Sequence, residues 1–269
     1  MAFAVIGDVT LFFTDEGSSA PPLLFVHGYS CDSHDWSWQL AHFVQNHRVI
    51  AVDLRGHGRS SVPEHGYSAA DFAADLAGLL DFLGVGPVVA VGHSLGGVVV
   101  SALAVERPEL VAGLVCVDPA YLLPGETAAK AEPFLAALAA TDPVPLIQQL
   151  LRRFDSPRLA PALRTWQLRR AAGVAPHVLR ETYESQIKGL TLVSHSGPYL
   201  ARRSCPVLSV YADPARIALE TPLFHDERSR AIAWQGAGHW LHQERPDEFN
   251  ALVADWLAGL KIGGRRAQL

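Results

Sequence analysis

Short hydrophobic runs alternate with segments of helical periodicity along most of this chain. Strands are predicted at residues 23–26, 49–52, 88–91, 114–117, 207–211 and 231–234. Most of these runs are continuously apolar, which is typical of strands buried on both faces of a parallel sheet. Helices are predicted at residues 36–46, 69–83, 95–106 and 246–260. The alternation therefore predicts an α/β fold, with a doubly wound, mostly parallel sheet between layers of helices.

The alternation stops after Asp118 and resumes near Pro206. The residues between them carry helical patterns at 134–140, 145–154, 161–172 and 178–187, with Pro and Gly residues between the patterns. We therefore expect a helical cap at residues 121–203. It is inserted between two strands of a core that comprises residues 1–120 and 204–269.

The composition suits a compact globular protein. Of the 269 residues, 49% are hydrophobic and 18% are charged, which is enough apolar side chain for one large domain or for a core with an inserted unit. The formal net charge is −5, and no cluster of Lys and Arg marks a track for a polynucleotide. We therefore expect no nucleic-acid partner.

Two further features bear on the location of the protein. Residues 1–9 are apolar, but no basic residue precedes Arg48, and no apolar run is long enough to span a bilayer. The three cysteines, Cys31, Cys116 and Cys205, are odd in number and far apart, which favours reduced thiols over a disulfide framework. We expect a cytoplasmic protein that does not enter a membrane.

The segment Gly92-His93-Ser94-Leu95-Gly96 joins a predicted strand to a predicted helix. A strand that turns into a helix within one residue strains the backbone of that residue, and flanking glycines remove side chains that would clash there. This context indicates a nucleophile elbow, with the hydroxyl of Ser94 exposed above the sheet. A glycine-rich turn that holds a buried serine is the alternative.

A serine hydroxyl needs a base that takes its proton and a third group that orients the base. His239 follows the last predicted strand, lies in a glycine-rich loop and precedes the final predicted helix, so we expect it to be the base. Four other histidines near these segments are expected to have packing or turn roles: His27, His57, His93 and His242.

The segment from Phe25 to Ser30 supplies a candidate oxyanion hole. A loop that leaves a strand through Gly28 can direct backbone N–H groups at a developing negative charge. We expect the N–H groups of Tyr29 and Leu95 to form this pair of donors.

Four motifs together carry a resemblance to a known superfamily. They are His27-Gly28, the loop from Asp53 to Ser60, the segment from Gly92 to Gly97, and Gly238-His239. These motifs follow one another in the order found in the α/β-hydrolase fold superfamily, which the chain therefore resembles. Within that superfamily it resembles the small capped bacterial esterase, lactonase and epoxide-hydrolase-like group. Ser94 argues against a haloalkane dehalogenase or an epoxide hydrolase, because by resemblance those enzymes carry a carboxylate at that place.

The acid of the triad departs from the pattern of the family. The resemblance places it in a Gly-x-x-Asp setting after the predicted strand at 207–211, at about Ala215, whereas the chain has Asp213 followed by Pro214. Asp118 ends the strand after the elbow helix, a position that some relatives use. We favour Asp118, and Asp213 is the alternative.

The sequence thus predicts a serine hydrolase that cleaves a small-molecule carboxylic ester or lactone through an acyl-enzyme, without a cofactor or a metal ion, as a monomer or a possible homodimer. Aromatic residues of the cap are candidates for the substrate pocket: Phe134, Phe154, Trp166 and Tyr183. A carbon–carbon bond hydrolase or a cofactor-free dioxygenase with a His/Asp base is a second class. A non-catalytic small-molecule receptor is a third.

Overall fold

The computed structural model describes residues 1–260. Within them, eight strands form one sheet in the order β1-β2-β4-β3-β5-β6-β7-β8. The strands are β1 (Ala2–Ile6), β2 (Val9–Glu16), β3 (Leu23–Val26), β4 (Val49–Val52), β5 (Val88–His93), β6 (Val111–Val117), β7 (Val207–Tyr211) and β8 (Arg230–Ala233). The pairings from β4 to β8 are parallel, and only those of β2 with β1 and β4 are antiparallel. This confirms the predicted α/β class.

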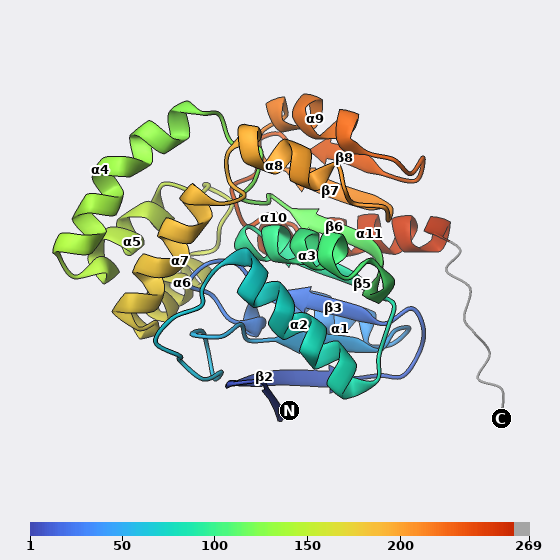
Figure 1. Cartoon of the computed structure of the whole chain (residues 1–269). Helices are drawn as coiled ribbons and strands as arrows, with labels where there is room; N and C mark the ends of the chain where they lie inside the picture. The colour runs from blue at the N-terminus through green and yellow to red at the C-terminus, as the bar shows by residue number, and fades with distance from the viewer. Residues whose placement is uncertain (261–269) are drawn as a thin grey trace.

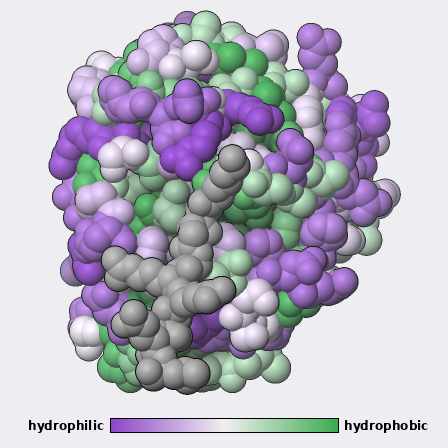
Figure 2. All heavy atoms as spheres, turned by 90° about the vertical axis from the view of Figure 1, so that its right-hand side faces the viewer, coloured by the Kyte–Doolittle hydropathy of each residue, from purple (hydrophilic) through white to green (hydrophobic). Residues whose placement is uncertain are grey.

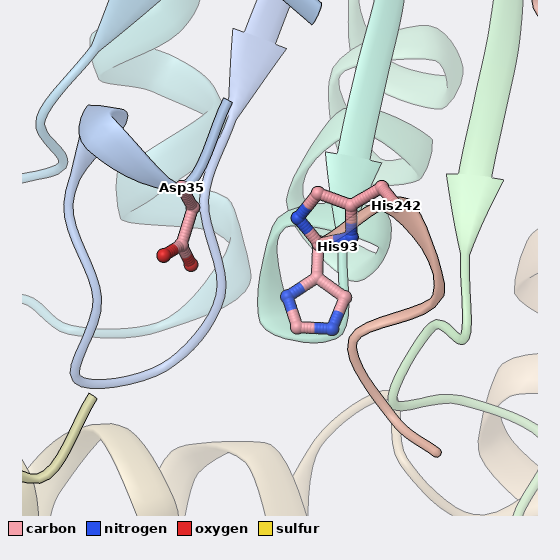
Figure 3. A group of neighbouring side chains, drawn as sticks. All are labelled: Asp35, His93 and His242. Atoms are coloured by element: carbon pink, nitrogen blue, oxygen red, sulfur yellow. The ribbon is translucent and has the colours of Figure 1, made fainter. Parts of the chain in front are cut away.

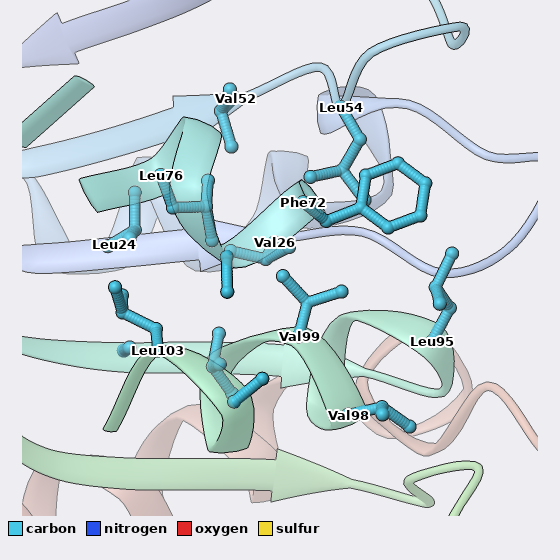
Figure 4. Packing of buried hydrophobic residues seen from close by; sticks show 14 of the residues in the cluster. Leu24, Val26, Val52, Leu54, Phe72, Leu76, Leu95, Val98, Val99 and Leu103 are labelled. Carbon is cyan, nitrogen blue, oxygen red and sulfur yellow. The ribbon is translucent and has the colours of Figure 1, made fainter. Parts of the chain in front are cut away.

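Helices cover both faces of the sheet (Figure 1). On one face lie α2 (Ala69–Leu83) and α3 (Leu95–Glu106), and on the other lie α1 (Ser37–Phe43) and α11 (Pro246–Leu260). Side chains of β3, β4, α2 and α3 interlock in the first of the two cores (Figure 4). Each fully buried leucine or valine there stabilises the fold by about 1.5–3 kcal/mol. Strands buried on both sides explain why their sequences are continuously apolar.

The first two strands are absent from the sequence prediction. They form a hairpin through the turn at Gly7 and Asp8, where Gly7 has a φ of 59°. In β1 only Ala4 is buried, while Phe3 and Val5 are exposed, so this apolar run lies at the edge of the sheet and is only partly covered. The Gly-Asp pair between two largely apolar segments was the available signal for a hairpin.

Five helices follow β6 and precede β7: α4 (Glu126–Ala140), α5 (Pro143–Arg152), α6 (Pro161–Gly173), α7 (Pro176–Lys188) and α8 (Val193–Leu200). Figure 1 shows α4 to α7 gathered at one end of the sheet. Four of these helices overlap the expected segments, and α8 was missed because Gly197 and Pro198 interrupt its pattern. That residues 121–203 fold as a separate cap stays a prediction.

The remaining elements are short. They are three 3-10 turns (Ser33–Trp36, Pro108–Leu110 and Thr221–Leu223) and the helices α9 (Ala215–Glu220) and α10 (Leu241–Glu244). The face turned away from α4 to α7 carries hydrophilic side chains with small groups of hydrophobic ones among them (Figure 2). Within residues 1–260, no helix combines the length and the apolar character that a membrane crossing requires.

Candidate active site

Ser94 lies in the turn between β5 and α3. Its φ is 52° and its ψ is −114°, a conformation that is costly for a residue with a side chain. The N–H of Ser94 donates to the carbonyl oxygen of Val117 at 2.9 Å, and its own carbonyl accepts from the N–H of Ala120 at 3.1 Å. The strained turn is thus held by the segment that follows β6.

Glycines around Ser94 allow backbones to approach closely. A Cβ on Gly96 would lie 2.2 Å from the carbonyl oxygen of Val26 and 2.7 Å from that of His27. A Cβ on Gly92 would lie 2.3 Å from the carbonyl oxygen of Gly96. The start of α3 therefore packs directly on the segment that leads into Tyr29, which only glycine permits.

His239 and Asp118 are in direct contact. Nδ1 of His239 lies 2.6 Å from Oδ2 of Asp118, and both side chains are 14% exposed. An ionised carboxylate only accepts hydrogen bonds, so in this contact Nδ1 of His239 carries the proton of the neutral ring. Nε2 of that ring then has a free lone pair and can accept a proton. Oδ1 of Asp118 accepts from the backbone N–H of Ala212 at 3.2 Å. Sequence reasoning missed this donor, because it is a backbone group without a side-chain signal.

Asp213, the alternative acid, has a different local role. Asp213 is exposed, and its Oδ1 accepts from the N–H of Ala215 at 2.9 Å, in the turn that leads into α9. The structure thus brings Asp118 to the ring of His239 and uses the carboxylate of Asp213 in a local turn.

His93 connects His239 to the elbow. Its Nε2 lies 3.0 Å from the carbonyl oxygen of His239, and the two rings are 4.6 Å apart between centroids. Since a carbonyl only accepts, Nε2 of His93 is the donor. His239 therefore lies beside the residue that precedes Ser94.

The loop after β3 is ordered by its own histidine. Nδ1 of His27 lies 2.8 Å from the carbonyl oxygen of Gly28, and Nε2 accepts from the N–H of Leu54 at 2.9 Å. Tyr29 follows, and its hydroxyl donates to the carbonyl oxygen of Leu179 in α7 at 2.6 Å. Leu95 opens α3, and the first N–H groups of a helix have no partner within it.

Three of the four candidate pocket aromatics gather near these residues. The ring of Phe154 lies 5.0 Å from that of His239, and the carbonyl oxygen of Phe154 accepts from the N–H of His239 at 3.3 Å. Tyr183 lies 6.2 Å from Tyr29 and 5.1 Å from Phe134, between ring centroids. Trp166 is 51% exposed. It lies beside His34, away from the group.

A groove of about 750 Å³ lies between α2, α3 and the segment from Ser185 to Tyr199. Small side chains of α2 form much of its wall: Ala69, Ala70, Ala73, Ala74 and Ala77. Of the predicted site residues, Leu95 borders the groove, while Ser94, His239 and Asp118 do not. The groove is therefore beside the elbow and not at it.

Asp35, His93 and His242 form a buried cluster next to the site (Figure 3). Their possible ligand atoms lie within 4.8 Å of one another, so we considered a metal ion. However, the guanidinium of Arg170 pairs with Asp35 and, at 3.2 Å, with Asp32. Arginine keeps its positive charge, so a second cation here would meet repulsion. These residues do not fit a metal site.

The histidines of this cluster are held neutral by burial. The pKa of His242 is lowered to about 3 and that of His93 well below its usual value, mainly by loss of water and in part by the nearby His239. His57, buried within the loop from Asp53 to Ser60, likewise has its pKa lowered to about 3, mainly by burial. Neutral rings beside His239 do not oppose a positive charge on it.

Comparison with known proteins identifies the family. A model of the alpha/beta hydrolase family matches residues 23–252, so the chain belongs to this family. The predicted superfamily and the prediction of a hydrolase enzyme are thereby confirmed.

Similar proteins include enzymes of several kinds. The dihydrolipoyllysine-residue acetyltransferase component of the acetoin cleaving system of Cupriavidus necator is 28% identical over 263 residues, 96% of this chain and 69% of that protein. Lipase LipV of Mycobacterium tuberculosis is 46% identical over 110 residues, 40% of this chain and 41% of the lipase. A thermophilic esterase from Thermogutta terrifontis has a TM-score of 0.82 at 25% identity, with 96% of each chain covered.

The first prediction concerns the elbow. Gly96→Ala is expected to lower the free energy of unfolding by about 3 kcal/mol, because the added methyl group would overlap backbone oxygens that cannot rotate away. Gly259→Ala in α11 is the control, since a Cβ there would meet no atom within 4 Å apart from the adjacent residues and the helix's own backbone. There the change should stabilise the helix by up to about 1 kcal/mol. Urea unfolding measures both, and wild-type stability of Gly96→Ala would contradict the packing described.

The second prediction concerns acid stability. The pKa values of His57, His93 and His242 are lower in the folded state than in the unfolded chain, so the folded state binds fewer protons. The contribution of these neutral rings to the free energy of unfolding is therefore fully present above about pH 6.5. It falls as the pH drops toward the pKa values of the folded state, by about 1.4 kcal/mol per pH unit for each ring.

His242→Phe should lower the slope of the free energy of unfolding against pH by the contribution of one proton. It should keep the stacking on Trp36, whose ring centroid lies 4.3 Å from that of His242. His42→Phe at an exposed position of α1 is the control and should leave the slope as it is. Urea unfolding between about pH 5 and about pH 8 gives the slopes. Equal slopes in wild type and His242→Phe would disprove the neutral burial of this ring.

Proposed function

We propose that this protein hydrolyses a small-molecule carboxylic ester or lactone, with Ser94 as nucleophile, His239 as base and Asp118 as the acid that orients it. The observation that carries the proposal is the 2.6 Å contact between Nδ1 of His239 and Oδ2 of Asp118, beside a serine held at a φ of 52°. Relatives named as a lipase and an esterase support ester chemistry.

In the first half of the reaction, Oγ of Ser94 attacks the carbonyl carbon of the ester and its proton passes to Nε2 of His239. The N–H groups of Tyr29 and Leu95 stabilise the negative oxygen of the tetrahedral intermediate. The intermediate collapses as the alcohol leaves with the proton from His239. The acyl group stays on Ser94 as an ester.

In the second half, water attacks the acyl-enzyme and gives a proton to His239. The second tetrahedral intermediate then releases the carboxylic acid, and the proton returns to Oγ of Ser94. In both halves His239 becomes positively charged for a time. The charge of Asp118 stabilises that state and keeps the proton of the neutral ring on Nδ1.

The substrate pocket is built in part by the inserted helices. Phe154 packs on the ring of His239, and Tyr29, Tyr183 and Phe134 form an aromatic surface next to the proposed oxyanion hole. Aromatic walls with few polar groups suit the apolar part of an ester or lactone. The cytoplasmic location and the homodimer stay predictions.

The third prediction tests the nucleophile. Ser94→Ala should remove turnover of p-nitrophenyl esters and lactones by several orders of magnitude and leave the fold intact, because a methyl group fits where the hydroxymethyl group was. Wild type should react with a fluorophosphonate probe at Ser94, which intact-mass spectrometry detects.

Other outcomes favour the other classes. Probe labelling without turnover of any ester would favour a receptor. Activity of Ser94→Ala within about tenfold of wild type would remove the acyl-enzyme mechanism and favour a His/Asp base. Oxygen consumption with a heteroaromatic ring would then identify a dioxygenase.

The fourth prediction tests the acid. Asp118→Asn should lower kcat by a factor on the order of ten thousand, because the uncharged amide no longer stabilises the charged ring. Asp213→Asn is the matched control: it removes the same charge and keeps an oxygen that can accept from the N–H of Ala215. Its kcat should stay close to that of wild type. A large loss in Asp213→Asn alone would transfer the role to Asp213.

A further inference from the structure

Glu220, the last residue of α9, is a fully buried carboxylate with three donors. The hydroxyl of Tyr121 donates to Oε1 at 2.6 Å, and that of Tyr211 donates to Oε2 at 2.6 Å. Nη2 of Arg203, also fully buried, donates to Oε1 at 3.0 Å. Burial raises the pKa of both tyrosines well above the usual value, so both hydroxyls keep their protons and remain donors.

Tyr121 belongs to the strained segment that carries Asp118. The φ of Asp118 is 39° and that of Leu122 is 56°, both positive in residues that have side chains. Arg216 donates to the carbonyl oxygens of Pro119, at 2.9 Å, and Tyr121, between these two strained residues. Such a backbone persists only where its surroundings hold it.

Tyr211 belongs to the strand that supports Asp118 from the other side. It ends β7, and the next residue, Ala212, donates its N–H to Oδ1 of Asp118. The N–H of Asp118 in turn donates to the carbonyl oxygen of Val210 at 2.8 Å. The two segments that place the carboxylate of Asp118 are therefore both tied to Glu220.

The same carboxylate also joins the two ends of the inserted helices. Tyr121 and Arg203 are the first and last residues of the predicted cap. Beside them, the N–H of Leu122 donates to Oγ of Ser196 at 3.0 Å. The side chain of Glu220 thus connects β7, the turn that follows Asp118 and both ends of the inserted segment.

We propose that Glu220, with Tyr121, Tyr211 and Arg203, is a positioning clamp that sets the carboxylate of Asp118 against His239. The proposal rests on the proposed function for the role of Asp118, but the contact it positions is present without a substrate. Glu220 touches neither substrate nor the reacting atoms and acts through the two segments that it holds. A buried ion pair that merely adds stability is the alternative.

Tyr211→Phe is the first variant, because it removes one donor and keeps the Glu220–Arg203 ion pair. Tyr67→Phe is the matched control, since it removes a hydroxyl that donates to the carbonyl oxygen of Pro63 from an equally buried ring. Glu220→Gln is the second variant, and it leaves the charge of Arg203 unbalanced. Its resonance and kcat are therefore compared with those of wild type only if circular dichroism shows that the variant is folded.

The readout is the low-field proton resonance of His239 Nδ1–H, assigned by its loss in Asp118→Asn. In Tyr211→Phe it should move upfield, and kcat should fall between about tenfold and about a hundredfold with KM within about twofold, the effect of a misplaced group. Tyr67→Phe should keep the resonance and kcat of wild type. The loss of kcat should be larger in folded Glu220→Gln.

An unchanged resonance in Tyr211→Phe, with a loss of stability equal to that of Tyr67→Phe, would overturn the clamp and leave a structural ion pair. If wild type hydrolyses no ester, the proposed function fails instead. The resonance still decides the clamp in that case, because it reports the contact between Asp118 and His239 and not the reaction.

Discussion

The close approach of backbones at Ser94 is the constraint on which the site depends. Gly92 and Gly96 let α3 begin against the carbonyl groups of Val26 and His27, and the N–H of Ser94 reaches Val117. Three parallel strands are thereby joined within one turn, and each brings one part of the candidate site with it. A side chain at either glycine would separate these parts, because backbone atoms cannot move aside as flexible side chains can.

The inserted helices contribute to the site by contacts with the core. The carbonyl oxygen of Phe154 accepts from His239, that of Leu179 accepts from the hydroxyl of Tyr29, and Arg170 pairs with Asp35. These three contacts reach the loops that bear the proposed base and the proposed oxyanion donors. The inserted segment therefore contacts the surroundings of the proposed catalytic groups, which lie in turns and loops that follow the strands.

Charge near His239 is distributed in a way that suits a base. The neighbouring rings of His93 and His242 are buried and neutral, and the carboxylate of Asp118 contacts the ring of His239. The buried charges of Asp35 and Glu220 are each matched by an arginine within hydrogen-bonding distance. A positive charge that forms on His239 during turnover would thus be met by one partner of opposite sign.

The sequence by itself determined the α/β class, the parallel strands from β3 to β8, the elbow at Ser94 and the candidate base, since apolar runs and glycine spacing are local patterns. It favoured Asp118 over Asp213 but could not establish which of them meets His239, because both follow strands and the contact is made between distant parts of the chain. Only the tertiary structure brought Asp118 to His239 and placed Asp213 in an exposed local turn before α9. The hairpin of β1 and β2 and the Glu220 cluster also appeared only there. The apolar run at residues 1–6 does not by itself show which strand it pairs with, and residues 99 positions apart, such as Tyr121 and Glu220, meet only when the chain is folded.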